Sequence, residues 1–306
     1  MDFVIGGAAA AGAALFSNPF DVLKTRMQLQ GELRARGQHA VFYKNTMHAG
    51  YVVAKNEGIR GLQKGLGAAI LMHSVRNSVR LGTYQWLNKN GMLTDENGKT
   101  IFYKSATASA FAGAAGAFFG SPLFLIKTQL QSQAAQNIAV GHQHGHNGAV
   151  QAFLFIYDKY GVTGLWRGLS GTISRAIVGS SAQLTTFAIT KDYLRESAVL
   201  KDYPMCSSLL SSIVSGVFQT VLMTPFDLVS TRLYNQGVDA KGRGLLYSGL
   251  IDCFIKIGKS EGFFGFYKGI GANYMRLAPH GALCLLFWDY LKDLQLRYID
   301  TKPQKS

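Results

Sequence analysis

Acidic residues and cysteines are scarce in this sequence. It contains 17 Asp and Glu among 306 residues, against 31 Lys and Arg, and only three cysteines. Cys206, Cys253 and Cys284 lie far apart and lack the spacing of metal ligands, which argues against a disulfide framework and a zinc site. We interpret them as solitary buried thiols. The formal net charge of +14 can indicate a nucleic-acid partner, so that class must be weighed against other features.

Charged residues are absent from three long stretches of the chain. These stretches are Phe3–Phe20, Ser105–Ile126 and Tyr203–Phe226. Roughly 18 or more apolar residues in a row can cross the ~30 Å hydrocarbon core of a bilayer. The first stretch has no charged leader and no cleavage site before it, so we expect a membrane span there and not a removable signal. The three stretches favour a membrane protein over a nucleic-acid-binding one.

The chain repeats two short motifs three times. The first motif begins at Pro19, Pro122 and Pro225, so the prolines are separated by two intervals of 103 residues. It reads Pro-Phe-Asp-Val-Leu-Lys-Thr-Arg in its first copy. The second motif is a glycine followed by a base and another glycine: Gly58 with Lys64-Gly65, Gly161 with Arg167-Gly168, and Gly262 with Lys268-Gly269. Self-similarity at a constant interval predicts three copies of one structural unit.

This threefold pattern resembles the mitochondrial carrier family, and the resemblance covers nearly the whole chain. It implies an all-α membrane protein, with six transmembrane helices in three pseudo-symmetric repeats and short surface helices on the matrix side. We expect the repeats at residues 1–90, 100–194 and 204–297. The departures from the family pattern are Phe124 and Tyr160 for acids, Ser230 for a base and Gln63 for an aromatic residue. The stretch Ser121–Thr128 is typical of the branch that contains oxaloacetate carriers.

The resemblance implies the inner mitochondrial membrane, and the charge of the loops predicts an orientation there. The three long loops, 24–64, 127–167 and 228–268, contain 17 basic and 6 acidic residues, whereas the short connections contain five of each. Loops that are rich in Lys and Arg tend not to be translocated across a membrane. We therefore expect the long loops to face the matrix and both termini to face the intermembrane space. These loops also explain most of the net charge, so we expect no nucleic-acid partner.

Polar side chains recur in the even-numbered predicted helices, at steps of four that keep them on one helix face. They are Arg76, Arg80, Arg175, Gln183 and Arg276. An intramembrane arginine costs about 3 kcal/mol or more unless it faces a water-filled cavity. Its planar guanidinium matches a carboxylate or a phosphate. We therefore predict that these residues bind an anionic substrate. Arg76 can equally well hold neighbouring helices together. The other arginines can also stabilise the helix bundle instead of binding a substrate.

The charges that follow the prolines predict a gate at the matrix end. In the family, the acid of each odd-numbered helix pairs with the base of the next. The pairs expected here are Asp21 with Lys127 and Asp227 with Lys24. The third pair would join Phe124 to Ser230, and both are uncharged. Because removal of one partner alone would leave a buried charge unpaired, the paired loss predicts a gate with two links. We also expect Pro19, Pro122 and Pro225 to kink their helices.

The predicted cytosolic gate has fewer charges. The family signature of an aromatic residue, an acid and a base is complete only in the stretch from Trp288 to Lys292, which includes Asp289. Elsewhere only hydrogen bonds remain, such as Gln85 to Lys191 or Asn88 to Asp289. We therefore expect a weak cytosolic gate made of Gln85, Asn88, Lys191, Asp289 and Lys292. An empty carrier with this gate should be open toward the cytosol.

Two groups of histidines invite a chemical role. His142, His144 and His146 lie in a polar loop without nearby cysteine or carboxylate, so we interpret them as a solvated tract and not as a metal site. His73 and His280 flank the predicted cavity. We interpret them as hydrogen-bonded core residues, and titration with a carried proton is the alternative. No metal is expected.

Together these features predict a monomeric transporter of small anions that works by alternating access, with antiport, uniport or proton coupling as alternatives that the sequence does not distinguish. The expected substrates are di- and ketocarboxylates such as oxaloacetate, with sulfate and phosphoenolpyruvate as further candidates. The helix starts after Gly65, Gly168 and Gly269 suit lipid phosphates, and the resemblance implies bound cardiolipin there, with no other cofactor. The alternatives are an anion or proton leak that resembles uncoupling proteins, and a non-transporting membrane adaptor. We find no nucleophile–base pair in the sequence that would predict an enzyme.

Overall fold

The computed structural model describes residues 2–34, 40–92, 102–196 and 204–300. Within these residues, long and short helices follow one another in the order long, short, long, three times over. The long helices are α1 (Asp2–Leu29), α3 (Leu66–Lys89), α4 (Phe102–Ser132), α6 (Leu169–Glu196), α7 (Pro204–Asn235) and α9 (Ile270–Asp300). The short ones are α2 (Thr46–Leu62), α5 (Ala149–Leu165) and α8 (Leu250–Glu261), with 3₁₀ turns η1 (Gln136–Ile138) and η2 (Phe263–Tyr267).

The first motif lies inside helices and not after them. Helices α1, α4 and α7 contain Pro19, Pro122 and Pro225 and continue well beyond them. A proline inside a helix removes one backbone hydrogen bond, which is the physical basis of the predicted kinks. The charged residues that follow each proline therefore stand on helical turns, which fix the directions of their side chains.

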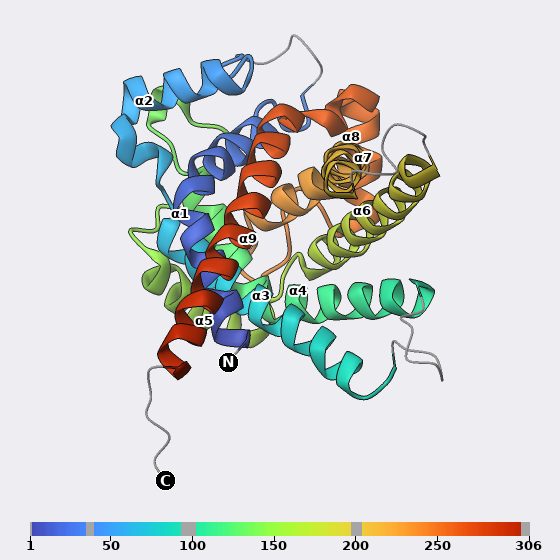
Figure 1. The fold of residues 1–306 in the computed structure, drawn as a ribbon. Helices are drawn as coiled ribbons and strands as arrows, with labels where there is room; N and C mark the ends of the chain where they lie inside the picture. The colour runs from blue at the N-terminus through green and yellow to red at the C-terminus, as the bar shows by residue number, and fades with distance from the viewer. Residues whose placement is uncertain (1, 35–39, 93–101, 197–203, 301–306) are drawn as a thin grey trace.

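The long helices form a closed ring. Each packs against two others, in the order α1, α3, α4, α6, α7, α9 and back to α1, and α1 and α9 lie side by side in Figure 1. Added Cβ atoms at Gly6 and Gly12 would lie 3.1 Å from the rings of Trp288 and Phe287, respectively. The start of α1 and the end of α9 therefore share one end of the ring.

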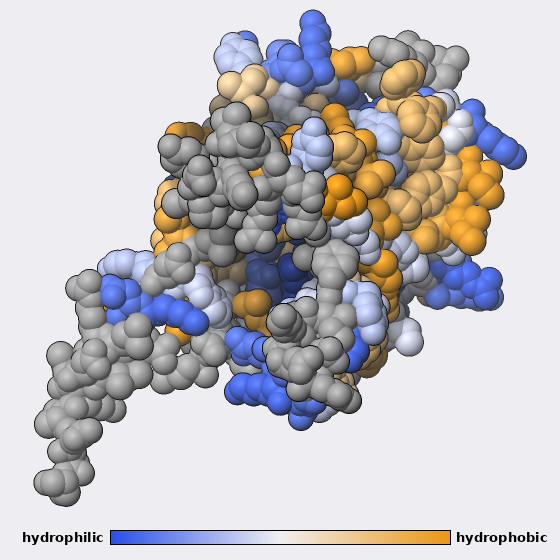
Figure 2. Space-filling view, turned by 45° about the vertical axis from the view of Figure 1, so that its right-hand side comes forward, coloured by the Kyte–Doolittle hydropathy of each residue, from blue (hydrophilic) through white to orange (hydrophobic). Residues whose placement is uncertain are grey.

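The ring has an apolar outside and a polar inside, which is the reverse of a water-soluble protein. On α7, Leu209, Phe218 and Leu222 are 57%, 53% and 50% exposed, whereas Ser211 and Thr224 are fully buried. Figure 2 shows broad hydrophobic surface and a hollow with a hydrophilic lining. Large exposed apolar patches suit contact with lipid.

Two of the described helices have the length and apolarity of a membrane span. They cover Tyr103–Ser132 within α4 and Leu209–Asn235 within α7. They overlap the second and third stretches that lack charge in the sequence. The six spans expected from the repeat pattern are therefore supported by hydropathy in part, and the remainder stays a prediction.

The short helices pack against one end of the ring, which we call the short-helix end. The same two positions of each are buried: Ala49 and Val53, Ala152 and Ile156, Cys253 and Ile257. They belong to three hydrophobic clusters, each with the last turns of a long helix. The thiol of Cys253 is buried as expected, Cys284 is partly exposed, and the side chain of Cys206 lies outside the described part of the structure.

Glycines form the corners that lead into the second, fourth and sixth long helices of the ring. Gly65, Gly168 and Gly269 have φ angles of 70°, 85° and 77° and stand directly before α3, α6 and α9. Side chains other than glycine rarely adopt this conformation. The helix starts predicted at these three positions are confirmed.

The close approach of α4 to α3 gives a first prediction. An added Cβ at Gly116 would lie 2.7 Å from the backbone oxygen of Arg76, whereas an added Cβ at Gly216 would meet nothing within 4 Å. Gly116→Ala should therefore lower the melting temperature by several degrees, because the backbone has to shift. Gly216→Ala is the matched control and should be neutral, or stabilising by up to ~1 kcal/mol through helix propensity. Equal thermal unfolding of both variants in detergent would contradict the close packing.

Candidate functional site

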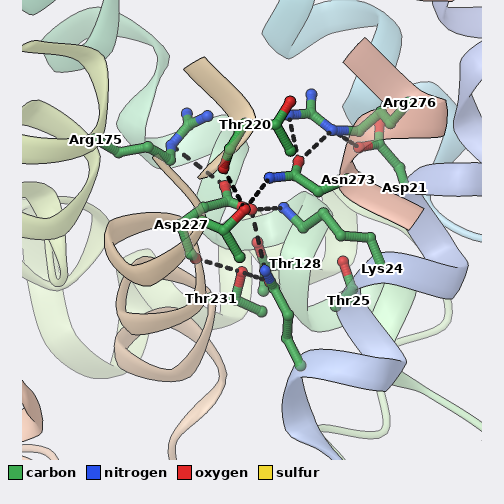
Figure 3. Close-up of polar contacts among 12 residues, drawn as sticks. Asp21, Lys24, Thr25, Thr128, Arg175, Thr220, Asp227, Thr231, Asn273 and Arg276 are labelled. Atoms are coloured by element: carbon green, nitrogen blue, oxygen red, sulfur yellow. Dashed lines mark hydrogen bonds and ion pairs between the residues drawn. The ribbon is translucent and has the colours of Figure 1, made fainter. Parts of the chain in front are cut away.

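Two buried ion pairs connect three long helices near the short-helix end. Lys127 Nζ on α4 lies 2.8 Å from Asp21 Oδ2 on α1, and Lys24 Nζ on α1 lies 2.8 Å from Asp227 Oδ2 on α7. None of these residues is more than 4% exposed. These are the two pairs expected from the first motif, and Figure 3 shows the second of them at the centre of a polar network.

Two arginines contact the same carboxylates. Arg276 Nε on α9 lies 3.3 Å from Asp21 Oδ1, and Arg175 Nε on α6 lies 3.6 Å from Asp227 Oδ1. Arg276 also donates a 3.1 Å hydrogen bond to Asn273 Oδ1, as Figure 3 shows. Four cations thus share two carboxylates in a group with excess positive charge. We call this group the charge cluster: Asp21, Lys24, Lys127, Arg175, Asp227 and Arg276.

The third position of the predicted gate has no ion pair. Phe124 and Ser230 are both buried, and Ser230 Oγ has no hydrogen-bond partner in the described part of the chain. The guanidinium carbon of Arg175 lies 5.0 Å from the centre of the Phe124 ring, within the range of a cation–π contact. Arg175 thereby connects α6 to α4 through Phe124 and to α7 through Asp227. Arg175 therefore connects helices at the position where the third ion pair of the predicted gate is absent from the described residues.

Arg76 and Arg80 lie where α3 packs against α4. Added Cβ atoms at Gly120 and Gly116 would lie 3.4 Å from the Cβ atoms of Arg76 and Arg80, respectively. Among the described residues neither arginine has an ion pair, and Arg76 Nε is buried without a hydrogen-bond partner. Gln183 on α6 is exposed. The structure thus brings Arg175 and Arg276 into the charge cluster, and it does not bring Gln183 there.

Two lysines at the end opposite the short helices lie over aromatic rings. Within the described residues no hydrogen bond joins Gln85 to Lys191. Instead, Lys191 Nζ lies 5.4 Å from the ring centre of Phe187 on its own helix. Similarly, Lys292 Nζ lies 5.0 Å from the ring centre of Trp288. The predicted hydrogen bond between Gln85 and Lys191 is therefore absent from this conformation.

The second predicted hydrogen bond at this end stays a prediction. The side chain of Asp289 lies outside the described part of the structure, and Asn88 is exposed. A neutral hydrogen bond of 2.9 Å between Tyr84 Oη and Ser105 Oγ joins α3 to α4 nearby. A hydroxyl pair of this kind is weaker than the ion pairs of the charge cluster.

His73 and His280 lie next to the charge cluster and next to each other. Their ring centres are 4.5 Å apart. His73 Nε2 lies 3.8 Å from Asp21 Oδ2, and His280 Nδ1 lies 3.0 Å from Ser17 Oγ. The sequence indicated that both histidines flank one cavity. It could not indicate their contact, because they stand on helices far apart in the chain.

The second motif contains a charged contact that sequence reasoning missed. Glu57 on α2 binds the guanidinium of Arg26 with both oxygens, at 2.7 and 2.9 Å, and Lys64 Nζ lies 2.7 Å from Glu57 Oε2. Burial alone would raise the pKa of Glu57, but hydrogen bonds from Arg26 and Lys64 lower this pKa to about 2. The carboxylate therefore stays charged and connects α2 to the last turns of α1.

An equivalent contact recurs between α7, α8 and η2. Arg232 Nη2 lies 2.9 Å from Glu261 Oε2, and Lys268 Nζ lies 2.6 Å from the same oxygen. The available signal was the regular spacing: each arginine stands seven residues after its proline, and each glutamate directly precedes a repeated glycine. We call these groups the Arg–Glu–Lys triads.

A hollow of about 470 Å³ lies where α3 and α5 begin. Its lining includes Lys64, Gly65 and Gly148. Gly65 and Gly148 are the N-caps of α3 and α5, and neither makes a side-chain capping hydrogen bond. Uncapped backbone N–H groups at helix starts attract anions, so this hollow suits a phosphate group.

Comparison with known proteins agrees with this architecture. The family described as mitochondrial carrier protein matches residues 1–93, 98–198 and 201–298. Solute carrier family 25 member 35 of Mus musculus is 48% identical over 97% of this chain and 99% of its own length. The mitochondrial oxaloacetate transport protein of Saccharomyces cerevisiae is 40% identical over 94% of this chain and 87% of its own. The mitochondrial citrate transporter E of Aspergillus niger is 36% identical over 97% and 94%. The protein therefore belongs to the mitochondrial carrier family, whose members are transporters and not enzymes.

Proposed function

We propose that this protein carries small anionic metabolites across the inner mitochondrial membrane by alternating access. The observation that supports this most is the charge cluster. Its four cations share two carboxylates deep inside the ring, and Arg76 and Arg80 stand nearby without ion pairs in the described structure. Excess positive charge in a hydrophilic hollow attracts an anion and disfavours a cation.

The substrates we propose are di- and ketocarboxylates such as oxaloacetate. Guanidinium groups bind carboxylates through two parallel hydrogen bonds, and Arg175 and Arg276 are placed to offer them from two sides of the cluster. A relative named as an oxaloacetate transport protein supports this class, and another named as a citrate transporter supports a carboxylate substrate more broadly. Sulfate and phosphoenolpyruvate have similar charge and remain candidates for the same arginines.

The membrane arrangement we propose has six spans in three repeats. Apolar side chains on the outside of the ring would contact lipid, and the polar hollow would contain water. The loops that contain α2, α5 and α8 have most of the positive charge and would face the matrix. Both termini would then face the intermembrane space, and the short-helix end would be the matrix end.

In this orientation, the conformation seen here would be closed toward the matrix and open toward the cytosol. Both ion pairs of the predicted matrix gate are formed, and they connect α1 to α4 and α1 to α7 at this end. We propose that an entering anion competes with Asp21 for Arg276 and with Asp227 for Arg175. It would thereby replace two inter-helix links and allow the matrix end to open.

Lipid and assembly complete the proposal. The hollow at the starts of α3 and α5 would bind a cardiolipin phosphate through uncapped N–H groups and Lys64. One chain has a complete ring with its own hollow, so we propose that the monomer transports. We also propose exchange of one anion for another, because the empty cluster retains all its internal ion pairs and would open less readily than the loaded one.

Arg276 gives the test of the proposed function. Arg276→Ala should reduce uptake of the carried anion in proteoliposomes by about tenfold to a hundredfold, since a charge-assisted contact contributes ~1.5–3 kcal/mol. Arg276→Lys should restore part of it, because the charge returns without the fork. Arg60→Ala removes an exposed arginine of α2 and should leave uptake unchanged.

Three outcomes would contradict this proposal. Wild-type uptake by folded Arg276→Ala protein would remove Arg276 from the substrate site. Proton conductance that purine nucleotides inhibit, without metabolite uptake, would favour the leak. An absence of uptake for every anion tested would favour the adaptor.

The ion pair between Lys24 and Asp227 gives a second test. Asp227→Asn leaves the buried ammonium of Lys24 without its carboxylate, and Lys24→Gln leaves the carboxylate of Asp227 with Arg175 at 3.6 Å as its remaining cation, so each should destabilise the protein by up to ~3 kcal/mol. The double variant removes both charges and should recover at least ~1 kcal/mol of that sum. Thermal unfolding of the four proteins in detergent measures the coupling. Strictly additive losses would show that the pair does not stabilise this closed end.

A further inference from the structure

The second repeat has no Arg–Glu–Lys triad. Its three equivalent residues are Gln129, Tyr160 and Arg167. Tyr160 directly precedes Gly161, as the glutamates of the other triads precede their glycines. Arg167 directly precedes the glycine before α6, where the other repeats have lysine. The acid has thus been lost, whereas the base that would bind it has been kept.

Arg167 therefore stands without an acid. Its Nε and Nη1 atoms are buried and have no hydrogen-bond partner, and none of the ion pairs among the described residues includes it. Gln129 donates from Nε2 to the backbone oxygen of Tyr234, but its Oε1 atom is also buried without a partner. Unsatisfied buried groups of this kind are costly. An acceptor for Arg167 and a donor for Gln129 are both missing.

These two side chains line a cavity of about 170 Å³, which we call the second-repeat pocket. Its other polar lining residues are His142, His144, His146, Lys159 and Tyr160. None of the residues that line it is Asp or Glu. Val238, which follows α7, also lines it, so the pocket lies between segments of the second and third repeats.

Part of the histidine tract is folded into this pocket, which corrects the expectation of a solvated tract for His146, whereas His142 is exposed. His146 is only 8% exposed, and His144 Nε2 donates a 2.9 Å hydrogen bond to the backbone oxygen of Asn235. Burial lowers the pKa of His144 to about 3, so this ring is neutral near pH 7. The fixed positive charge of the pocket therefore comes from Arg167 and Lys159. Within the described residues, no group of His, Cys, Asp or Glu has the arrangement of a metal site.

We propose that the second-repeat pocket binds inorganic phosphate, which retains a P–OH group near pH 7, at the place where the other repeats have a glutamate. The phosphate oxygens would accept from Arg167. The hydroxyl of the protonated phosphate would donate to Gln129 Oε1. Sulfate, a carboxylate and a lipid phosphodiester have no such hydrogen near pH 7, so they satisfy only half of the pocket. A bound phosphate would connect α5 to the segment after α7.

This site is separate from the charge cluster, and its test does not depend on the proposed transport. Purified protein in detergent is titrated with inorganic phosphate while the melting temperature is recorded, because a ligand that binds the folded state raises it. Wild type and Arg276→Ala should both respond, since Arg276 does not line the pocket. Arg167→Gln should weaken the apparent phosphate affinity at least about tenfold.

A second variant imitates the missing acid. Tyr160→Glu offers Arg167 an internal carboxylate, so it should raise the melting temperature without phosphate and abolish the response to phosphate. Tyr160→Gln is the matched uncharged control and should retain that response. These variants keep the test informative if Arg167→Gln does not fold.

Several results would overturn the assignment. An unchanged phosphate response in Arg167→Gln, or in Tyr160→Glu, would place the phosphate elsewhere. A response that disappears in Arg276→Ala would assign it to the charge cluster. Equal stabilisation by sulfate, or an Arg167-dependent response to cardiolipin-containing micelles and not to inorganic phosphate, would contradict a protonated phosphate.

Discussion

The pairing of buried charge is the constraint on which the rest of this structure depends. Asp21 and Asp227 are almost fully buried, and a buried carboxylate is tolerated only when cations and hydrogen-bond donors surround it. Those cations come from α1, α4, α6 and α9, so satisfying two carboxylates joins most of the ring. The apolar exterior can contribute little to this choice of neighbours, because lipid and leucine are nearly equivalent surroundings.

The same pairing explains how a ligand can act on the conformation. A structural pair needs one cation for each carboxylate, whereas here Asp21 and Asp227 each contact two. The lysines and arginines are not equivalent, since Arg175 and Arg276 have forks that suit a substrate carboxylate. An anion can therefore take the arginines without leaving the aspartates unpaired. In the proposed function, the internal ion pairs and the external ligand would compete for the same groups, which would couple binding to the end that these ion pairs close.

Contacts between copies of the first motif could be predicted from the sequence better than contacts that involve other parts of the chain. The pairs Asp21–Lys127 and Lys24–Asp227 follow from one motif that recurs at one interval, so a resemblance was enough to infer them. The contact of Arg276 with Asp21 depends on the relative depth of α9 and α1, which no spacing within either helix encodes. The triad of Arg26, Glu57 and Lys64 was also missed, although its spacing was regular, because it depends on how α2 packs against α1 and on the non-helical backbone at Gly58.

Two of the acids that the second repeat lacks are replaced by aromatic residues, and the surroundings of these two residues differ. Phe124 replaces an acid whose expected partner, Ser230, is also uncharged, so no cation is left over and Arg175 can stack on the ring. Tyr160 replaces an acid whose partner, Arg167, is retained with buried, unpartnered N–H groups. Where the acid and its basic partner are both missing, no charge is left unpaired. Where only the acid is missing, the remaining base lacks a negatively charged partner. This difference distinguishes the gate position at Phe124 from the proposed phosphate site at Tyr160, although both positions have an aromatic residue in place of an acid.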